Sequence, residues 1–125
     1  MKLFNKVNPW AFPITWMIVI FIGSSIHLSP DESVPLVSDK IVHFIEYGIL
    51  GALFFFAFIR TGERKRYVLF VILSTVSAFA YGVTDEIHQY FVPTREFCVY
   101  DLIADFSGGL FFSLLMSYLF RHKCN

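Results

Sequence analysis

The sequence predicts an all-α membrane protein, a four-transmembrane-helix bundle with both termini cytoplasmic. Hydrophobic residues make up 56 % of the chain, 16 of its 125 residues are phenylalanine, and only 16 % are charged. Soluble domains carry about 25 % charged residues, so this composition favours lipid as the solvent. Four apolar runs follow one another, each close to the roughly 20 residues that cross a bilayer. The length fits one domain, over residues 1–125.

The four expected spans cover about residues 10–26, 39–59, 67–91 and 99–120. The first resembles a signal peptide, because lysines precede it and Ser24-Ser25 lies near its end. No convincing small-x-small cleavage site follows, so we expect a retained helix.

Helix-capping and turn-forming residues separate the spans. Asp39, or Ser38 before it, is expected to cap the second helix by accepting from free backbone N–H groups. Thr61-Gly62 is expected to end that helix, and Ser29–Glu32 and Pro93-Thr94 to turn the chain outside the spans.

Basic residues predict the orientation, because lysine and arginine concentrate in short cytoplasmic segments. With four spans, three segments share one side, and they carry Lys2, Lys6, Arg60, Arg64, Lys65, Arg66, Arg121 and Lys123. The other two connections carry Asp31, Glu32, Arg95 and Glu96. We therefore expect a multi-pass protein of the cytoplasmic membrane with the acidic and mixed loops outside.

Ionisable residues inside the apolar spans gather at the expected outer end. Such residues are costly in a bilayer, usually face a bundle interior, and mark a functional site by default. Many are three or four positions apart, so they share helix faces. The sequence therefore predicts a polar pocket that opens outward. Its candidates are Asp39, Lys40, His43, Glu46 and Tyr47, then Asp85, Glu86, His88 and Gln89, then Arg95, Asp101 and Asp105.

Two chemistries suit these residue types. A histidine beside a carboxylate can act as a general base, which makes the candidate catalytic set His43, His88, Asp85 and Asp101. Carboxylate–imidazole pairs on facing helices can also bind zinc or iron, and this candidate metal set is His43, Glu46, Asp85 and His88. The same groups could instead form only a hydrogen-bonded network. Neither a Gly-x-Ser-x-Gly nor a His-Glu-x-x-His motif is present, so whether the protein is an enzyme stays open.

The remaining polar residues have two interpretations each. The Arg95 guanidinium could clamp a phosphate or carboxylate, or pair internally with an aspartate. Lys40 could bind a ligand, although an interface role is the simpler interpretation. We interpret Cys98 and Cys124 as incidental, since they fit no zinc spacing.

Several function classes are disfavoured. A net charge of zero provides no basic field for nucleic acid. Phe54–Phe56 and Phe111-Phe112 lie on the cytoplasmic side of the polar residues and predict no polar path across the membrane. That argues against an ion conductor or a transporter.

Three motifs resemble the VanZ-like family of small membrane proteins. They are Asp-Lys-x-x-His-Phe-x-x-Tyr from Asp39 to Tyr47, Thr-Asp-Glu-x-His-Gln-x-Phe-Val-Pro from Thr84 to Pro93, and Arg95 followed by Val-Tyr-Asp-Leu from Val99 to Leu102. The resemblance runs from about Ser38 to Gly109. It departs from the family at Asp105, where Asn is usual, and at Thr94, where Gly is frequent before the arginine.

The family is named for a protein that raises resistance to the glycopeptide teicoplanin. The outward-facing pocket of histidines, carboxylates and an arginine beside lipid leads us to expect a site for a cell-envelope substrate, either a phosphorylated lipid-linked precursor or an antibiotic with a lipid tail. The expected substrate-binding residues are Asp39, Lys40, Tyr47, Glu86, Gln89 and Arg95. The competing hypothesis is a non-enzymatic protein whose polar layer locks the helices together. The sequence leaves the oligomeric state open.

Overall fold

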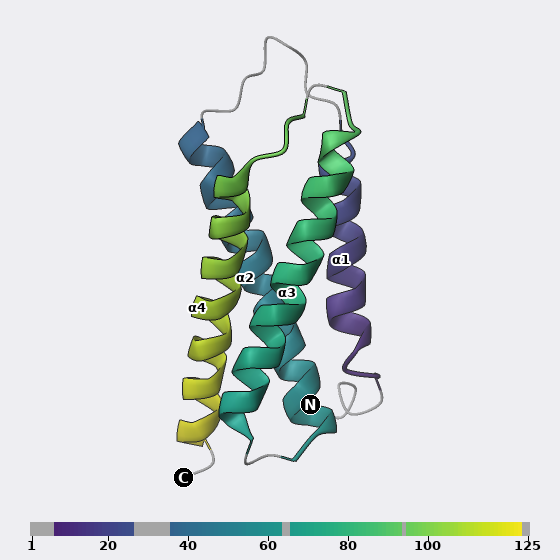
Figure 1. Cartoon of the computed structure of the whole chain (residues 1–125). Coiled ribbons are helices and arrows are strands. Elements are labelled where there is room, and N and C mark those ends of the chain that lie inside the picture. Colours follow the sequence, from purple (N-terminus) through teal and green to yellow (C-terminus); the bar gives the residue numbers. More distant parts are fainter. Residues whose placement is uncertain (1–6, 27–35, 64–65, 94, 124–125) are drawn as a thin grey trace.

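The computed structural model describes residues 7–26, 36–63, 66–93 and 95–123, which contain four helices and no strand. Successive helices run in opposite directions, so the chain passes up and down the bundle (Figure 1). The helices are α1 (Ala11–Ser24), α2 (Leu36–Thr61), α3 (Tyr67–Tyr90) and α4 (Val99–Lys123).

Helices α2, α3 and α4 contain segments long and apolar enough to cross a membrane, namely Asp39–Thr61, Tyr67–Tyr90 and Val99–His122. The prediction of an all-helical protein with membrane-type helices is confirmed. Helix α2 begins at Leu36, so Ser38 and Asp39 both lie in its first turn and neither is the cap residue that we expected. A carboxylate in the first turn still interacts favourably with the positive end of the helix dipole.

Helix α1 is shorter than the expected first span, about residues 10–26. It has 14 residues, which at 1.5 Å per residue is roughly 21 Å, short of the roughly 30 Å hydrocarbon core. At its end, the hydroxyls of Ser24 and Ser25 both donate to the carbonyl oxygen of Phe21. The described chain therefore has three helices of spanning length and one shorter apolar helix.

Small residues let α2 and α4 approach closely, and these two helices make the most extensive contact in the bundle. A Cβ atom added to Gly51 would lie 2.7 Å from the carbonyl oxygen of Gly109, and one added to Gly48 would meet the ring of Phe112. Glycine at such positions is typical of tightly packed membrane helices. Because α2 and α4 are so close, the polar residues at their ends are brought within bonding distance.

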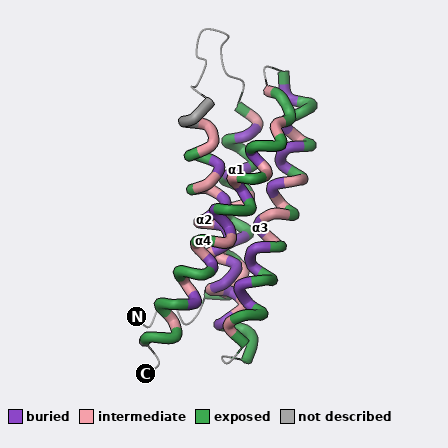
Figure 2. The backbone as a smooth tube through the Cα atoms, turned by 60° about the vertical axis from the view of Figure 1, so that its left-hand side comes forward, coloured by how far each residue is buried: buried purple, intermediate pink, exposed green. Residues whose placement is uncertain are grey.

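Burial separates an inner from an outer surface on every helix (Figure 2). Large aliphatic side chains such as Ile18, Ile72 and Leu114 are exposed along the bundle, where lipid would contact them. Tyr90 and Tyr100 are exposed where α3 ends and α4 begins, as in the aromatic belts of membrane interfaces.

The end of the bundle where α2 begins, α3 ends and α4 begins is called the polar end below. The start of α1, the α2–α3 connection and the end of α4 lie at the opposite end (Figure 1). Arg60, Arg66 and Arg121 lie at that opposite end. That this end faces the cytoplasm stays a prediction. The other residues used for orientation and turns, Lys2, Lys6, Ser29–Glu32, Arg64, Lys65 and Thr94, lie outside the described residues, as does the Lys123 side chain.

Candidate functional site

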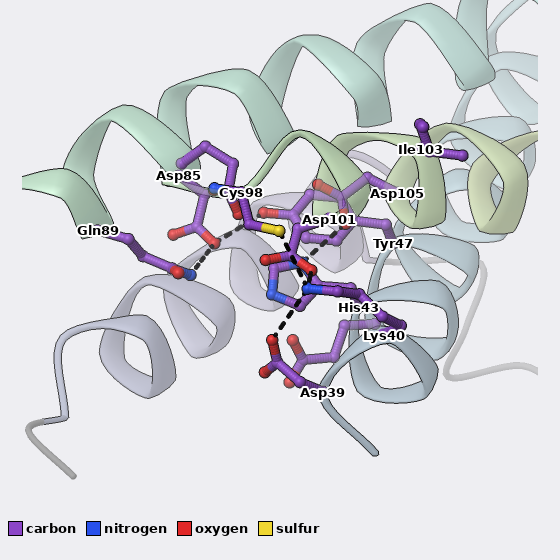
Figure 3. Close-up of polar contacts among 12 residues, drawn as sticks. Asp39, Lys40, His43, Tyr47, Asp85, Gln89, Cys98, Asp101, Ile103 and Asp105 are labelled. Carbon is purple, nitrogen blue, oxygen red and sulfur yellow. Dashed lines mark hydrogen bonds and ion pairs between the residues drawn. The ribbon is translucent and has the colours of Figure 1, made fainter. Parts of the chain in front are cut away.

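Polar side chains from α2, α3 and α4 meet at the polar end (Figure 3). Each helix contributes polar residues one turn apart, such as Asp39 and His43, Asp85 and Gln89, and Asp101 and Asp105, so the side chains of each pair project from the same face. We call this group the polar cluster. It consists of Asp39, Lys40, His43, Glu46, Tyr47, Asp85, Glu86, Gln89, Arg95, Asp101 and Asp105.

A histidine–aspartate pair lies at the centre of the polar cluster. His43 Nδ1 and Asp105 Oδ1 are 2.9 Å apart, and their side chains are only 5 % and 0 % exposed. This bond joins α2 to α4. With Nδ1 engaged, Nε2 is the ring nitrogen left for another ligand, and a carboxylate in this place fixes the ring orientation.

A second buried network joins α2 to α3. The Tyr47 hydroxyl donates to Asp85 Oδ2 over 3.0 Å, and Gln89 Nε2 donates to the same oxygen over 3.1 Å. The Tyr47 ring also stacks on His43, with ring centres 6.0 Å apart. The two networks therefore share a side-chain contact and form one unit.

Lys40 lies at the mouth of the polar cluster. Its ammonium group pairs with Asp101 Oδ1 and lies 3.4 Å from both Asp39 Oδ2 and Cys98 Sγ. The backbone N–H of Cys98 donates to Glu86 Oε2 over 3.0 Å. Lys40 thus makes an internal pair across α2 and α4, a role that sequence reasoning did not assign to it.

The surroundings of Arg95 bear on whether its guanidinium binds a ligand or pairs internally. Arg95 interacts electrostatically with Glu46, which in turn interacts with His43 and Asp85. Its Nε atom is buried and has no hydrogen-bond partner among the described residues. The guanidinium therefore lies within electrostatic range of Glu46 and keeps a donor for another group.

His88 lies apart from the other candidates, on the side of α3 that faces α1. Its Nε2 atom is 3.0 Å from the Ser25 hydroxyl, and its ring lies 4.6 Å from that of Phe21. The expected metal set was His43, Glu46, Asp85 and His88. No three of these described residues place their ligand atoms within 4.8 Å of one another. The i,i+3 spacing predicted a shared face for Asp85 and His88, but a helix advances 100° per residue and three steps leave them about 60° apart.

A different trio has the geometry of a metal group. One ligand atom each of Asp39, His43 and Asp101 lies within 4.8 Å of the others. Asp101 is buried, and Asp39 is half-buried at the mouth. These are the described residues that could hold an ion.

Several buried oxygens of the polar cluster have unused bonding capacity. Asp85 Oδ1, Glu86 Oε1 and Asp105 Oδ2 are buried and have no hydrogen-bond partner among the described residues. Leaving such an atom unsatisfied costs about 1–3 kcal/mol, and more when it is charged. The cluster is therefore suited to receive a hydrogen-bond donor or a cation.

Towards the opposite end, the interior is less apolar than the sequence suggested. Buried hydroxyls continue along α3 and α4, although no charged side chain is buried there among the described residues. These hydroxyls belong to Ser74, Thr75, Ser113 and Ser117. Outside this interior, an open groove of about 370 Å³ lies between α3 and α4 at the opposite end, lined mainly by exposed apolar residues with Ser117 and Arg121.

Sequence reasoning underrated two residues of the polar cluster's structure. Cys98 was interpreted as incidental, yet its backbone and its sulfur contact Glu86 and Lys40. Asp105 was predicted as a member of the polar pocket but was given no partner or role, and it is the partner of His43. Its spacing of four from Asp101 was the available signal, since it places both carboxylates on one face of α4.

The comparisons agree with the motifs. The family model described as VanZ/LLP1 matches residues 4–121 of the chain. No curated protein and no solved structure matches the chain.

Proposed function

The chain belongs to the VanZ/LLP1 family, and from this premise we propose that its polar cluster binds or modifies an anionic or lipid-linked cell-envelope substrate. The observation that carries the proposal is the buried pair of His43 and Asp105. A buried, oriented imidazole with one free ring nitrogen can accept a proton from a bound group.

Arg95 supplies the second element of the proposal. Its Nε atom keeps an unused donor beside the cluster, and guanidinium groups bind phosphate and carboxylate through paired hydrogen bonds. The exposed rings of Tyr90 and Tyr100 lie at the same end and suit a membrane interface. A lipid-linked substrate would present its polar head at this level and its chain to the bilayer.

We extend the proposal to the glycopeptide teicoplanin, because its lipid tail would bring it to the same surface. In this proposal the polar end faces outward, where envelope precursors and the antibiotic are found. Resistance would then arise because the protein binds or alters the envelope component that the antibiotic meets.

The test compares His43→Ala and Arg95→Ala with the parent protein in cells challenged with teicoplanin. Folded protein in the membrane is measured in parallel, by expression level and by thermal unfolding after purification. We expect both variants to fold and to lose resistance and binding to a lipid-linked phosphorylated precursor in nanodiscs. Unchanged precursor binding in both variants would contradict the proposal.

A structural lock is the second candidate, and one observation favours it. The bonds of His43 to Asp105, Tyr47 to Asp85 and Lys40 to Asp101 each join two helices. A lock predicts that stability and phenotype fall together in every variant. A folded His43→Ala protein without resistance would exclude it.

A further inference from the structure

The outer part of the polar cluster contains more negative than positive charge. Asp101 is buried, Glu86 is fully buried, and Asp39 lies beside them at the mouth. Lys40 is the cation that pairs with Asp39 and Asp101. Carboxylates held in apolar surroundings are strongly disfavoured unless a cation balances them. One lysine for these carboxylates leaves an excess that a bound cation would neutralise.

The ligand atoms are placed to meet such a cation. Zinc–ligand distances are roughly 2.0–2.2 Å, so ligand atoms on opposite sides of one ion are about 4 Å apart. One atom each of Asp39, His43 and Asp101 already lies within 4.8 Å of the others. A small inward movement of side chains would close this trio around one ion.

Two features behind the trio support it independently. His43 is held through Nδ1 by Asp105, and metal-binding histidines usually donate their other ring nitrogen to a carboxylate in this way. Glu86 Oε1 is buried without a hydrogen-bond partner among the described residues, and Glu86 interacts electrostatically with both Asp101 and His43. This unpaired carboxylate oxygen, within electrostatic range of two members of the trio, is suited to stabilise a positive ligand.

We propose that Asp39, His43 and Asp101 bind a divalent transition-metal ion, and that the Lys40 ammonium group occupies the same place when the ion is absent. One imidazole and two carboxylates suit Zn²⁺ or Mn²⁺ better than Mg²⁺, which prefers oxygen ligands alone. Lys40 starts at the mouth of the cluster on a flexible stem, so its head group can move away when the ion enters. This inference concerns the ion alone and does not depend on the substrate proposed above.

The test titrates Zn²⁺, Mn²⁺ and Mg²⁺ into the full-length protein in nanodiscs by calorimetry, without any substrate. We expect one equivalent of Zn²⁺ or Mn²⁺ to bind more tightly than Mg²⁺. Affinity should fall at least about tenfold in Asp101→Asn and in Asp39→Asn, the latter at a half-exposed position where the fold is least at risk. Thermal unfolding without metal checks the fold of each variant.

Two further variants locate the ion. Lys40→Met should bind the ion more tightly, because it removes the competing charge and keeps the apolar stem. Glu63→Gln is the matched control, since Glu63 is an exposed carboxylate paired with Arg66 at the opposite end, and it should leave affinity unchanged. Absence of binding in the parent protein, or an affinity equal to that of the parent in both Asp39→Asn and Asp101→Asn, would overturn the site. Unchanged affinity in Lys40→Met would overturn the shared position.

Discussion

The Asp105 carboxylate occupies the space beside Gly82 that a larger residue would need. A Cβ atom added to Gly82 would lie 2.5 Å from Asp105 Oδ2 and 3.2 Å from Asp105 Cβ. Only glycine on α3 therefore lets this carboxylate sit between α3 and α4 while its other oxygen bonds His43. The orientation of the central imidazole thus depends on a glycine that carries no chemistry of its own.

Gly82→Ala should displace the Asp105 carboxylate and disturb its bond to His43. Inserting a methyl group into a packed interior typically costs about 1–3 kcal/mol, which thermal unfolding in nanodiscs would measure. Resistance and ligand binding should fall as well. Gly23→Ala is the matched control, because nothing lies within 4 Å of a Cβ atom added to Gly23, and it should leave stability and function intact. Equal behaviour of the two variants would contradict the packing argument.

Tyr47→Phe should destabilise the protein through one lost hydrogen bond. The hydroxyl donates to Asp85 Oδ2, and the other oxygen of Asp85 is already without a partner among the described residues. Weakening the solvation of a buried carboxylate costs about 1–3 kcal/mol. Thermal unfolding at neutral pH measures the effect.

Tyr118→Phe serves as the control for Tyr47→Phe. Tyr118 lies on α4 with an exposed side chain, so the loss of its hydroxyl should change stability by less than about 0.5 kcal/mol. If the Tyr47→Phe protein is as stable as the Tyr118→Phe protein, the hydrogen bond from the Tyr47 hydroxyl to Asp85 does not stabilise the fold.

The long helices could be predicted from composition and punctuation, because lipid selects for uninterrupted apolar segments. The bounds of α3 and α4 follow the expected spans closely, whereas the first helix is shorter than predicted. The apolar run continues to Ile26, but the helix ends at Ser24. Hydropathy alone does not set the residue at which an apolar helix ends.

The polar cluster was predictable as a set of residues but not as a set of bonds. The cost of charge in a bilayer identified Asp39, His43, Asp85 and Asp101 without any contact information. Which of them pair depends on helix rotation, and sequence spacing sets rotation only within one helix. His88 shows the limit of this reasoning. It is three residues from Asp85, which suggested a shared face, but its ring lies against α1.

His88→Ala should therefore behave unlike His43→Ala. His88 contacts Ser25 and Phe21, so its loss should weaken the packing of α1 and lower the free energy of unfolding by about 1 kcal/mol. Ligand binding at the polar cluster should be unchanged. His43→Ala should abolish binding. Comparing the two variants in one binding assay checks the assignment, and loss of binding in His88→Ala with a stable fold would return His88 to the site.

Sidedness is tested by cysteine labelling in intact cells. In a Cys98→Ser, Cys124→Ser background, Glu96→Cys lies at the polar end and Glu63→Cys at the opposite end, and both positions are exposed. If basic segments face the cytoplasm, a membrane-impermeant maleimide should label position 96 in intact cells and position 63 only after permeabilisation. The reverse pattern would place the polar cluster on the cytoplasmic face. A substrate or antibiotic confined to the outside would then have no access to His43, and the proposed function would fail even if every contact described above were correct.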